Sequence, residues 1–308
     1  MTRRLAAIDC GTNSIRLLIA DAIDGHLRDV YREMRIVRLG QGVDATGRFA
    51  AGALDRTRAA LADYAALCTT HGVEQVRMVA TSAARDAANR DVFFAMTAEV
   101  LGVRAEVVTG AQEAELSFSG AVNELDLAGA PFVVVDLGGG STEIVLGESG
   151  VVASFSADIG CVRVTERCLQ SDPPTPAEVA AARELVRERL GEALDAVPVE
   201  RARTWVGVAG TMTTLAALAQ DMPTYDAAAI HLSRVGIERL LAVCDGLIGM
   251  TRSRRAALGP MHAGRADVIG AGAIVVEELA LALRERAGIE ELTVSEHDIL
   301  DGIALSIA

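Results

Sequence analysis

Two copies of one strand–turn–strand pattern, separated by most of a domain length, constrain what this chain can fold into. Residues 5–20 and residues 131–147 each hold an apolar run that ends in a carboxylate, Asp9 in the first copy and Asp136 in the second. A turn with glycine and serine follows each carboxylate, and a second apolar run follows the turn. An internal repeat of this kind predicts two related domains, each offering one turn to a shared cleft.

The turn of the second copy has the composition of an anion-binding loop. It places three consecutive glycines before Ser141 and Thr142, and Glu143 then opens the next apolar run. Glycines let an anion approach the backbone amides closely, and hydroxyls add hydrogen-bond donors. Asp136 and Glu143 are available for a divalent cation. On this stretch alone, a glycine-rich hairpin turn without a ligand is an equally good interpretation.

The chain has no lysine, and all 29 of its basic residues are arginine. This excludes a P-loop with its GK[ST] lysine, a Schiff-base lysine and the lysine of a protein kinase. The net charge of −13 argues against nucleic acid as a partner. If the protein handles phosphate, backbone amides, hydroxyls, arginines and metal ions must do so.

Length and composition predict a globular protein of the cytoplasm. A chain of 308 residues makes one large or two ordinary domains, and its hydrophobic content of 51% provides an ample core. The longest uncharged stretch, residues 204–220, is interrupted by glycines and threonines, so we expect no membrane span and no membrane partner. No apolar signal region is seen at the N-terminus. The five cysteines are odd in number and lack a CxxC spacing, which fits a reducing cytoplasm, and we expect them to be packing residues.

Strand and helix patterns alternate along the chain, which predicts the α/β class. We expect a strand at residues 104–108, and helices at residues 52–71, 264–283 and 298–307. Asn89 is predicted to cap another helix, and Thr175 opens a capping box with Glu178. We expect a first domain at residues 1–127, against which the closing helix at 298–308 packs, and a second domain at residues 128–308.

Three further places are candidates for chemistry. Thr109 and Gln112 form a capping box, which puts Glu113 in the first turn of a helix just past a strand end; spacing alone favours a surface glutamate that stabilises the helix dipole. Gly210 and Thr211 lie where a strand turns into a helix, a position that suits an anion or an ordinary capped helix equally. The densest basic run is either a solvated face or a phosphate-binding face; it consists of Arg252, Arg254, Arg255 and Arg265.

Six blocks in register resemble the exopolyphosphatase and guanosine pentaphosphate phosphohydrolase (Ppx/GppA) family, which belongs to the actin, sugar kinase and heat-shock chaperone superfamily. They cover nearly the whole chain in order, at residues 8–16, 80–89, 109–116, 135–143, 207–211 and 265–269. The resemblance implies two actin-like (ribonuclease H-like) domains with a cleft between them. It also implies hydrolysis of the terminal phosphoanhydride of inorganic polyphosphate and, from the family only, a homodimer.

The resemblance assigns roles to matching positions. Glu113 matches the glutamate that activates water, which reverses the interpretation from spacing. Asp136 and Glu143 match carboxylates tied to Mg²⁺, with Mn²⁺ as an alternative. The expected phosphate-binding residues are Gly11, Thr12, Asn13, Ser14, Arg16, Arg85, Gly138, Gly139, Gly140, Ser141, Thr142, Gly210, Thr211 and Arg265.

The chain departs from the family pattern at Gln112 and Glu115, where the family commonly has glutamate and arginine. The second departure removes a positive charge and puts the exact phosphate path in question. Long family members carry a further C-terminal helical domain, so we expect low processivity on very long polyphosphate. Guanosine pentaphosphate or a nucleoside triphosphate is an alternative substrate, and a small-molecule kinase or a non-enzymatic nucleotide sensor is a more distant alternative.

Overall fold

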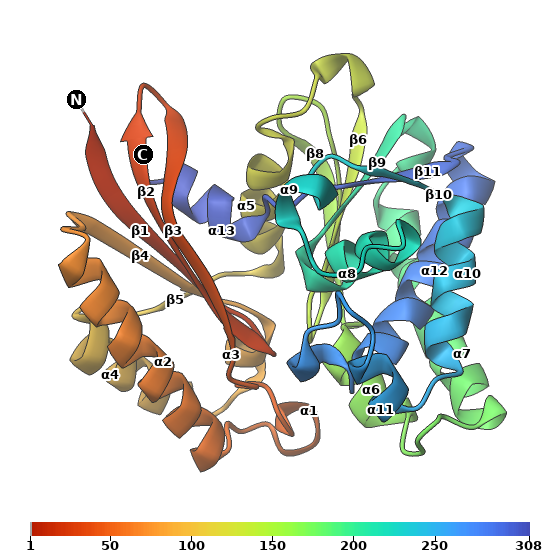
Figure 1. Cartoon of the computed structure of the whole chain (residues 1–308), viewed down its shortest axis with the longest axis horizontal. Helices are drawn as coiled ribbons and strands as arrows, with labels where there is room; N and C mark the ends of the chain where they lie inside the picture. The colour runs from red at the N-terminus through yellow and green to blue at the C-terminus, as the bar shows by residue number, and fades with distance from the viewer. Residues whose placement is uncertain (1) are drawn as a thin grey trace. The chain divides into compact units, whose positions relative to one another are not determined.

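A computed structural model describes residues 2–308 of the chain, which divide into two compact units. Unit 1 consists of residues up to Gly120 together with Asp298–Ala308, and unit 2 consists of Ala121–His297 (Figure 1). The division therefore falls a few residues before the boundary expected from the sequence. The closing segment belongs to unit 1 although it follows unit 2 in the chain.

Unit 1 contains a five-stranded sheet with the order β3-β2-β1-β4-β5. Neighbours β1, β2 and β3 are antiparallel, whereas β4 and β5 run parallel to β1. The strands are β1 (Arg3–Cys10), β2 (Ser14–Ile23), β3 (His26–Ile36), β4 (Gln75–Ala80) and β5 (Glu106–Val107).

Each face of this sheet has its own core, because side chains alternate along a strand. Ala6 and Ile8 of β1 pack with Leu61 and Phe93, which lie on α2 (Ala51–Thr70) and α4 (Arg90–Leu101). Leu5 and Ala7 pack instead with residues of α13 (Ile299–Leu305), and Leu116 of α5 (Gly110–Val122) joins this second core. We call the second face the α5/α13 face.

Unit 2 repeats this sheet and adds one strand. Its order, β10-β11-β9-β6-β7-β8, matches that of unit 1 when β6, β7 and β8 stand for β1, β2 and β3. The strands are β6 (Phe132–Leu137), β7 (Thr142–Gly147), β8 (Val151–Ala157), β9 (Thr204–Val208), β10 (Arg234–Gly236) and β11 (Glu291–Val294). The predicted internal repeat is thus present as two related sheets.

Long helices bury the sheet of unit 2. Its core contains Trp205 of β9 together with residues of α7 (Pro176–Ala196), α10 (Ile237–Ile248) and α12 (Ile269–Ala287). No helix among residues 2–308 combines the length and the apolar character needed to cross a membrane. The remaining elements are α1 (Val43–Thr46), α3 (Ser82–Asp86), α6 (Cys161–Cys168), α8 (Ala209–Ala219), α9 (Ala227–Ile230), α11 (Arg252–Ala256) and the 3₁₀ turns Leu127–Gly129, Val199–Arg201 and Ala263–Arg265.

Local capping signals predicted helix starts well. Both hydrogen bonds of the capping box are formed between Thr109 and Gln112, and again between Thr175 and Glu178. The predicted helix at 52–71 is α2, with Gly72 following in a left-handed conformation. All five cysteines are free; four are buried, and Cys168 is half-buried.

Four local predictions were wrong, and for Asn89 and Arg255 the reason is a tertiary contact that takes the side chain. Asn89 does not cap α4, because its amide exchanges two hydrogen bonds with the backbone of Phe49. The helix expected from residue 264 begins at Ile269, after a 3₁₀ turn, and the strand at 104–108 shrinks to two residues. Arg255 is buried and donates to the carbonyls of Leu247 and Ile248 at the end of α10, so it does not belong to a solvated or phosphate-binding face.

Candidate active site

The two turns of the repeat have the same backbone geometry. In unit 1 the N–H of Gly11 donates to the carbonyl of Ser14 at 2.9 Å, and in unit 2 the N–H of Gly138 donates to that of Ser141 at 3.1 Å. The residues at the strand ends are also equivalent. Asp9 pairs across the strands with Arg16, and Asp136 pairs with Glu143. The residues that align in the two copies of the sequence pattern therefore occupy equivalent positions in the two units.

In unit 2, the start of α6 fixes which way the glycine turn faces. The N–H groups of Cys161 and Val162 donate to the carbonyls of Gly138 and Gly139 at 3.0 and 2.9 Å, and Nε of Arg163 donates to the carbonyl of Gly140 at 2.7 Å. Because a trans peptide points its N–H opposite to its C=O, the amides of residues 139–141 face away from α6. This is the arrangement that an anion-binding loop requires.

The turn of unit 1 is held in the same manner by the segment after β3. The carbonyl of Asn13 accepts from the N–H groups of Val37 and Arg38, and that of Thr12 accepts from Gly40 at 2.8 Å. The amides of Asn13 and Ser14 consequently point away from this segment. Thr12 is buried, and its side chain packs where a Cβ on Gly40 would lie.

The hydroxyl groups of the predicted site differ in their use. Oγ1 of Thr142 donates to the carbonyl of Ile159, and the residue is fully buried, so this hydroxyl holds the turn rather than a ligand. Ser141 is also buried. Thr211, at the start of α8, hydrogen-bonds the thiol of Cys161, which ties α8 to α6.

Asp136 and Glu143 form a buried pair of carboxylates beside the glycine turn, at the closed end of the β6–β7 hairpin. They lie directly opposite each other in the register, and both are buried. Like charges directly opposite in an antiparallel pair destabilise the sheet unless a cation offsets them. Oγ of Ser156 donates to Glu143 Oε1 at 2.7 Å and orients that carboxylate. Two oriented carboxylates suit Mg²⁺, which prefers oxygen ligands.

Glu113 lies in the first turn of α5, and its carboxylate is buried. Nη1 of Arg85 donates to Glu113 Oε2 at 2.5 Å and to the carbonyl of Val108 at 3.1 Å. The side chain of Thr81 also hydrogen-bonds Glu113. The pKa of Glu113 is raised to about 6: burial raises it most, Arg85 lowers it, the negative charge of Asp9 raises it, and the hydrogen bond from Thr81 lowers it. The carboxylate is thus a stronger base than an exposed glutamate.

Arg16 is paired within unit 1, whereas the sequence predicted that it holds phosphate. Its Nε and Nη2 donate to Asp9 Oδ2 at 3.0 and 2.7 Å, and its Nη1 donates to Asp298. A guanidinium that bridges two carboxylates has most of its charge offset. Arg16 therefore orients Asp9 in this structure, and the turn's amides remain the candidate phosphate-binding groups of this copy.

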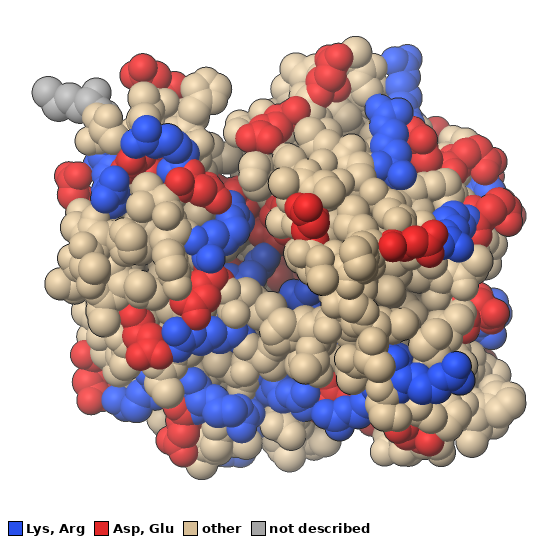
Figure 2. Space-filling model, in the orientation of Figure 1, with Lys and Arg blue, Asp and Glu red and all other residues tan. Residues whose placement is uncertain are grey.

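The remaining arginines predicted for phosphate lie at different places. Arg85 contacts Glu113, as described, and Arg265 packs against Gly210, to whose carbonyl its Nη1 donates at 3.4 Å. A Cβ at Gly210 would overlap this guanidinium, so any larger residue there would displace the side chain of Arg265. Arg252 and Arg254 are exposed. On the visible face of each unit, basic and acidic side chains are interspersed (Figure 2).

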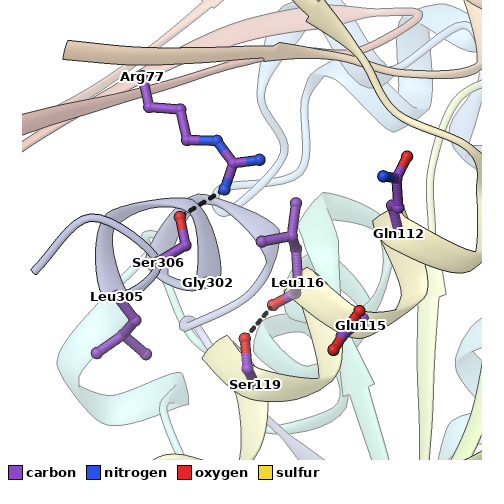
Figure 3. A pocket seen from close by; sticks show the side chains of 8 residues that line it. All are labelled: Arg77, Gln112, Glu115, Leu116, Ser119, Gly302, Leu305 and Ser306. Atoms are coloured by element: carbon purple, nitrogen blue, oxygen red, sulfur yellow. Dashed lines mark hydrogen bonds between the residues drawn. The ribbon is translucent and has the colours of Figure 1, made fainter.

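A pocket of about 450 Å³ lies between α5 and α13 on the α5/α13 face, apart from Glu113. Gln112 and Glu115, the two departures from the family pattern, line it together with Leu116 and Ser119 (Figure 3). Arg77 crosses its rim and donates to Ser306 at 2.5 Å. These helix positions share one side of α5, so the departures face this pocket and not the carboxylate of Glu113.

Unit 2 also brings Glu124, His231 and His297 within reach of one ion. Nδ1 of His231, however, accepts a hydrogen bond from the N–H of Glu296 at 3.2 Å. The ring proton of neutral His231 is therefore on Nε2, which lies 3.0 Å from Glu124 Oε2 and donates to it. Both ring nitrogens of His231 are thus engaged in hydrogen bonds, whereas Nδ1 of His297 lies 3.7 Å from Glu124 Oε1.

Sequence reasoning missed three residues that build the site. Arg163 and Gly160 fix the glycine turn of unit 2, and a Cβ on Gly160 would overlap the backbone of Gly139. Asp298 anchors Arg16 from the far end of the chain. Gly160 could have been found from its position directly before the start of a helix. No neighbouring residue in the sequence indicated the role of Asp298.

Known proteins resemble this chain over almost its full length. The exopolyphosphatase 2 of Mycobacterium tuberculosis (strain ATCC 25618 / H37Rv) is 75% identical over 314 aligned residues, which cover 99% of this chain and 98% of that protein. A crystal structure of an exopolyphosphatase-like protein superposes with a TM-score of 0.97 at 42% identity, covering 100% of this chain and 98% of the other.

The Ppx/GppA family member of Aquifex aeolicus has a TM-score of 0.81 at 31% identity, over 100% of this chain and 98% of its own. The expected mixed α/β fold of two actin-like units is confirmed by these neighbours and by the two equivalent sheets. A model of the Ppx/GppA phosphatase family matches residues 18–307. The chain therefore belongs to the Ppx/GppA phosphatase family, as the family match and the 75% identity to an exopolyphosphatase show.

Proposed function

We infer that the protein is an exopolyphosphatase, which hydrolyses the terminal phosphoanhydride of inorganic polyphosphate and releases orthophosphate. Membership of a phosphatase family and the 75% identity to an exopolyphosphatase support this substrate. The observation that carries the mechanism is Glu113, a buried carboxylate with a pKa of about 6 at the start of α5. Such a group accepts a proton near neutral pH.

In the proposed reaction, Glu113 orients a water molecule and takes its proton as the water oxygen attacks the terminal phosphorus. The bond from that phosphorus to the bridging oxygen breaks, and the leaving chain is one phosphate shorter. The amides of residues 139–141 in unit 2, and those of Asn13 and Ser14 in unit 1, are each candidates to bind phosphoryl oxygens. Arg85, hydrogen-bonded to Glu113, keeps the carboxylate in one rotamer.

We propose that Asp136 and Glu143 hold a Mg²⁺ ion, with Mn²⁺ as an alternative. The support is their position opposite each other on β6 and β7, their burial, and the hydrogen bond from Ser156. When bound, the ion would offset the charge of the phosphate chain. Loss of phosphate release in EDTA and its recovery with Mg²⁺ but not Ca²⁺ would support this site.

Phosphate release measured across substrates tests the function. The panel holds polyphosphates of several lengths, guanosine pentaphosphate and ATP, each with Mg²⁺. We expect the highest kcat/KM with polyphosphate. A preference for guanosine pentaphosphate or ATP would assign the same site to the alternative substrate. Phosphorylated product without free phosphate would indicate a kinase, and nucleotide binding without any release would indicate a sensor.

We further propose that the protein is a cytoplasmic homodimer and that it binds neither nucleic acid nor membranes. The five free cysteines suit a reducing compartment, and the acidic net charge disfavours nucleic acid. The homodimer follows from the family resemblance. Sedimentation equilibrium at micromolar protein concentration checks it, and a single species with the mass of one chain would contradict it.

A further inference from the structure

Asp9 is a buried carboxylate that the proposed reaction has not used. It lies at the end of β1 and is only 4% exposed. Its Oδ2 accepts two hydrogen bonds from Arg16, whereas its Oδ1 is buried without a hydrogen-bond partner among residues 2–308. A buried carboxylate oxygen without a partner is costly, so its retention calls for a reason.

The contacts of Asp9 extend to the end of the chain. Arg16 also donates to Asp298, whose Oδ1 caps α13 by accepting from the N–H of Leu300 at 3.0 Å. The row Asp9–Arg16–Asp298 therefore joins β1, β2 and the start of α13. It holds the Asp9 carboxylate in one orientation, and alternation along β1 places that side chain on the α5/α13 face with Leu5 and Ala7.

Glu113 lies next to this row. Asp9 and Cys10 of β1 pair with Val79 and Ala80 of β4, and the N–H of Thr81 donates to the carbonyl of Cys10 at 3.2 Å. The side chain of Thr81 in turn hydrogen-bonds Glu113. One residue thus connects the end of the Asp9 strand to the proposed base.

We infer that Asp9 is a positioning residue for hydrolysis: Arg16 and Asp298 hold its carboxylate near Glu113, where it keeps a second negative charge beside the base. This inference rests on the proposed role of Glu113. The unpartnered oxygen fits the role, because an oxygen fully satisfied by hydrogen bonds would exert a weaker field on its neighbour.

The balance of charges around Glu113 gives the direction of the effect. Arg85 and Thr81 favour the charged carboxylate, whereas burial and Asp9 favour the protonated one. Arg16 is ion-paired with both Asp9 and Asp298, so the charges of Arg16 and Asp298 largely offset each other. The charge of Asp9 is the one in this row that Glu113 senses. The charge of Asp9 therefore makes Glu113 hold its proton more tightly and act as a stronger base.

The pH profile of kcat for Asp9→Asn tests the inference. We expect the acidic limb to move to lower pH by on the order of one unit, and the plateau kcat to fall about tenfold, with KM changed less than about threefold. The matched control is Asp21→Asn. Asp21 is similarly buried in the same pair of strands. It pairs with Arg4, and both lie on the face of the sheet opposite to that of Asp9. An unmoved limb in Asp9→Asn, or the same movement in Asp21→Asn, would overturn the inference.

Asp298→Asn keeps the inference testable if Asp9→Asn does not fold. Asparagine caps helices as well as aspartate, so α13 should persist. The charge of Arg16 is then less offset, and we expect the acidic limb to move to lower pH as well. Glu113→Gln separates the two proposals. If it abolishes turnover while neither variant moves the limb, only the inference about Asp9 fails; if it remains active, the proposed function of Glu113 fails.

Discussion

At the scale of single residues, the site sets burial against charge at Glu113. Burial favours the protonated carboxyl and raises the pKa of Glu113, whereas Arg85 favours the charged carboxylate and lowers that pKa. Together they bring the pKa to about 6, where the group is charged at neutral pH yet still accepts a proton. The arrangement suits catalysis at the expense of stability.

The first prediction concerns that stability. The folded-state pKa of Glu113 is raised from 4.5 to about 6, so the native state holds this proton more tightly than the unfolded state. As the pH rises from 4.5 to about 6, Glu113 loses its proton first in the unfolded chain, and the free energy of unfolding falls by about 2 kcal/mol. We expect Glu113→Gln to gain up to this amount relative to wild type between pH 4 and pH 7.5 in urea unfolding. A difference between the two proteins that is independent of pH would contradict the raised pKa.

The second prediction concerns Arg85. Its charge lowers the pKa of Glu113, so Arg85→Gln should move the acidic limb of the kcat profile upward by ~1–3 units. Arg58→Gln is the matched control, because Arg58 pairs with Glu99 on the exposed surface of unit 1. Protonation of the substrate would shift the acidic limb by the same amount in both variants, so only the difference between them reports Glu113. A limb that stays near pH 6 in Arg85→Gln would show that another group controls it.

At the scale of elements, the start of α6 decides the direction of the glycine turn. Four hydrogen bonds from the start of α6 to the carbonyls of Gly138, Gly139 and Gly140 turn the amides outward. The approach is close enough that position 160 has no room for a side chain. The turn therefore depends on a helix that is distant from it in the sequence.

The third prediction tests this packing. Gly160→Ala should separate α6 from the turn, lower the stability of unit 2 by roughly 1–3 kcal/mol and raise KM for polyphosphate. Gly191→Ala is the control: a Cβ there meets nothing, and the residue lies inside α7, so we expect a gain of about 0.5–1 kcal/mol. Thermal unfolding and steady-state kinetics of both variants measure this. Unchanged stability in Gly160→Ala would mean that the turn does not need the close approach.

The sequence predicted elements best where the determining contacts are local. The capping boxes at Thr109 and Thr175 join residues three apart, and the repeated turns close on themselves. It did not foresee contacts with partners that are distant in the sequence. Asn89 binds Phe49 instead of its helix, and Arg16 meets Asp298, 282 positions away. Neither contact leaves a periodic trace in the sequence.

At the scale of the whole molecule, the chain leaves unit 1 after Gly120 and returns to it at Asp298. The returning helix α13 supplies Ile299, Leu300 and Ile303 to the core on the α5/α13 face, and Asp298 to the row that holds Asp9. Unit 1 is thus completed by the last residues of the chain. Its stability and its site depend on the same segment.

The fourth prediction follows from this return. Ile303→Ala removes a fully buried side chain and should destabilise unit 1 by about 2–5 kcal/mol. The only tryptophan, Trp205, is buried in unit 2, so its fluorescence reports that unit, whereas far-UV circular dichroism reports both. We expect the dichroism transition of Ile303→Ala to begin at lower urea than the fluorescence transition. The exposed control Leu127→Ala should change neither, and coincident, equally shifted transitions in Ile303→Ala would show that the units unfold as one.

The turnover of Glu113→Gln with polyphosphate and Mg²⁺ tests the central claim most directly. Glutamine keeps the shape of the side chain but cannot accept the proton of the attacking water. We predict that kcat falls on the order of 10²–10⁴-fold, with KM changed only a few-fold. Glu115→Gln, two residues along the same helix and exposed, should retain nearly full activity. Near-normal turnover by Glu113→Gln would contradict the assignment of Glu113 as the base.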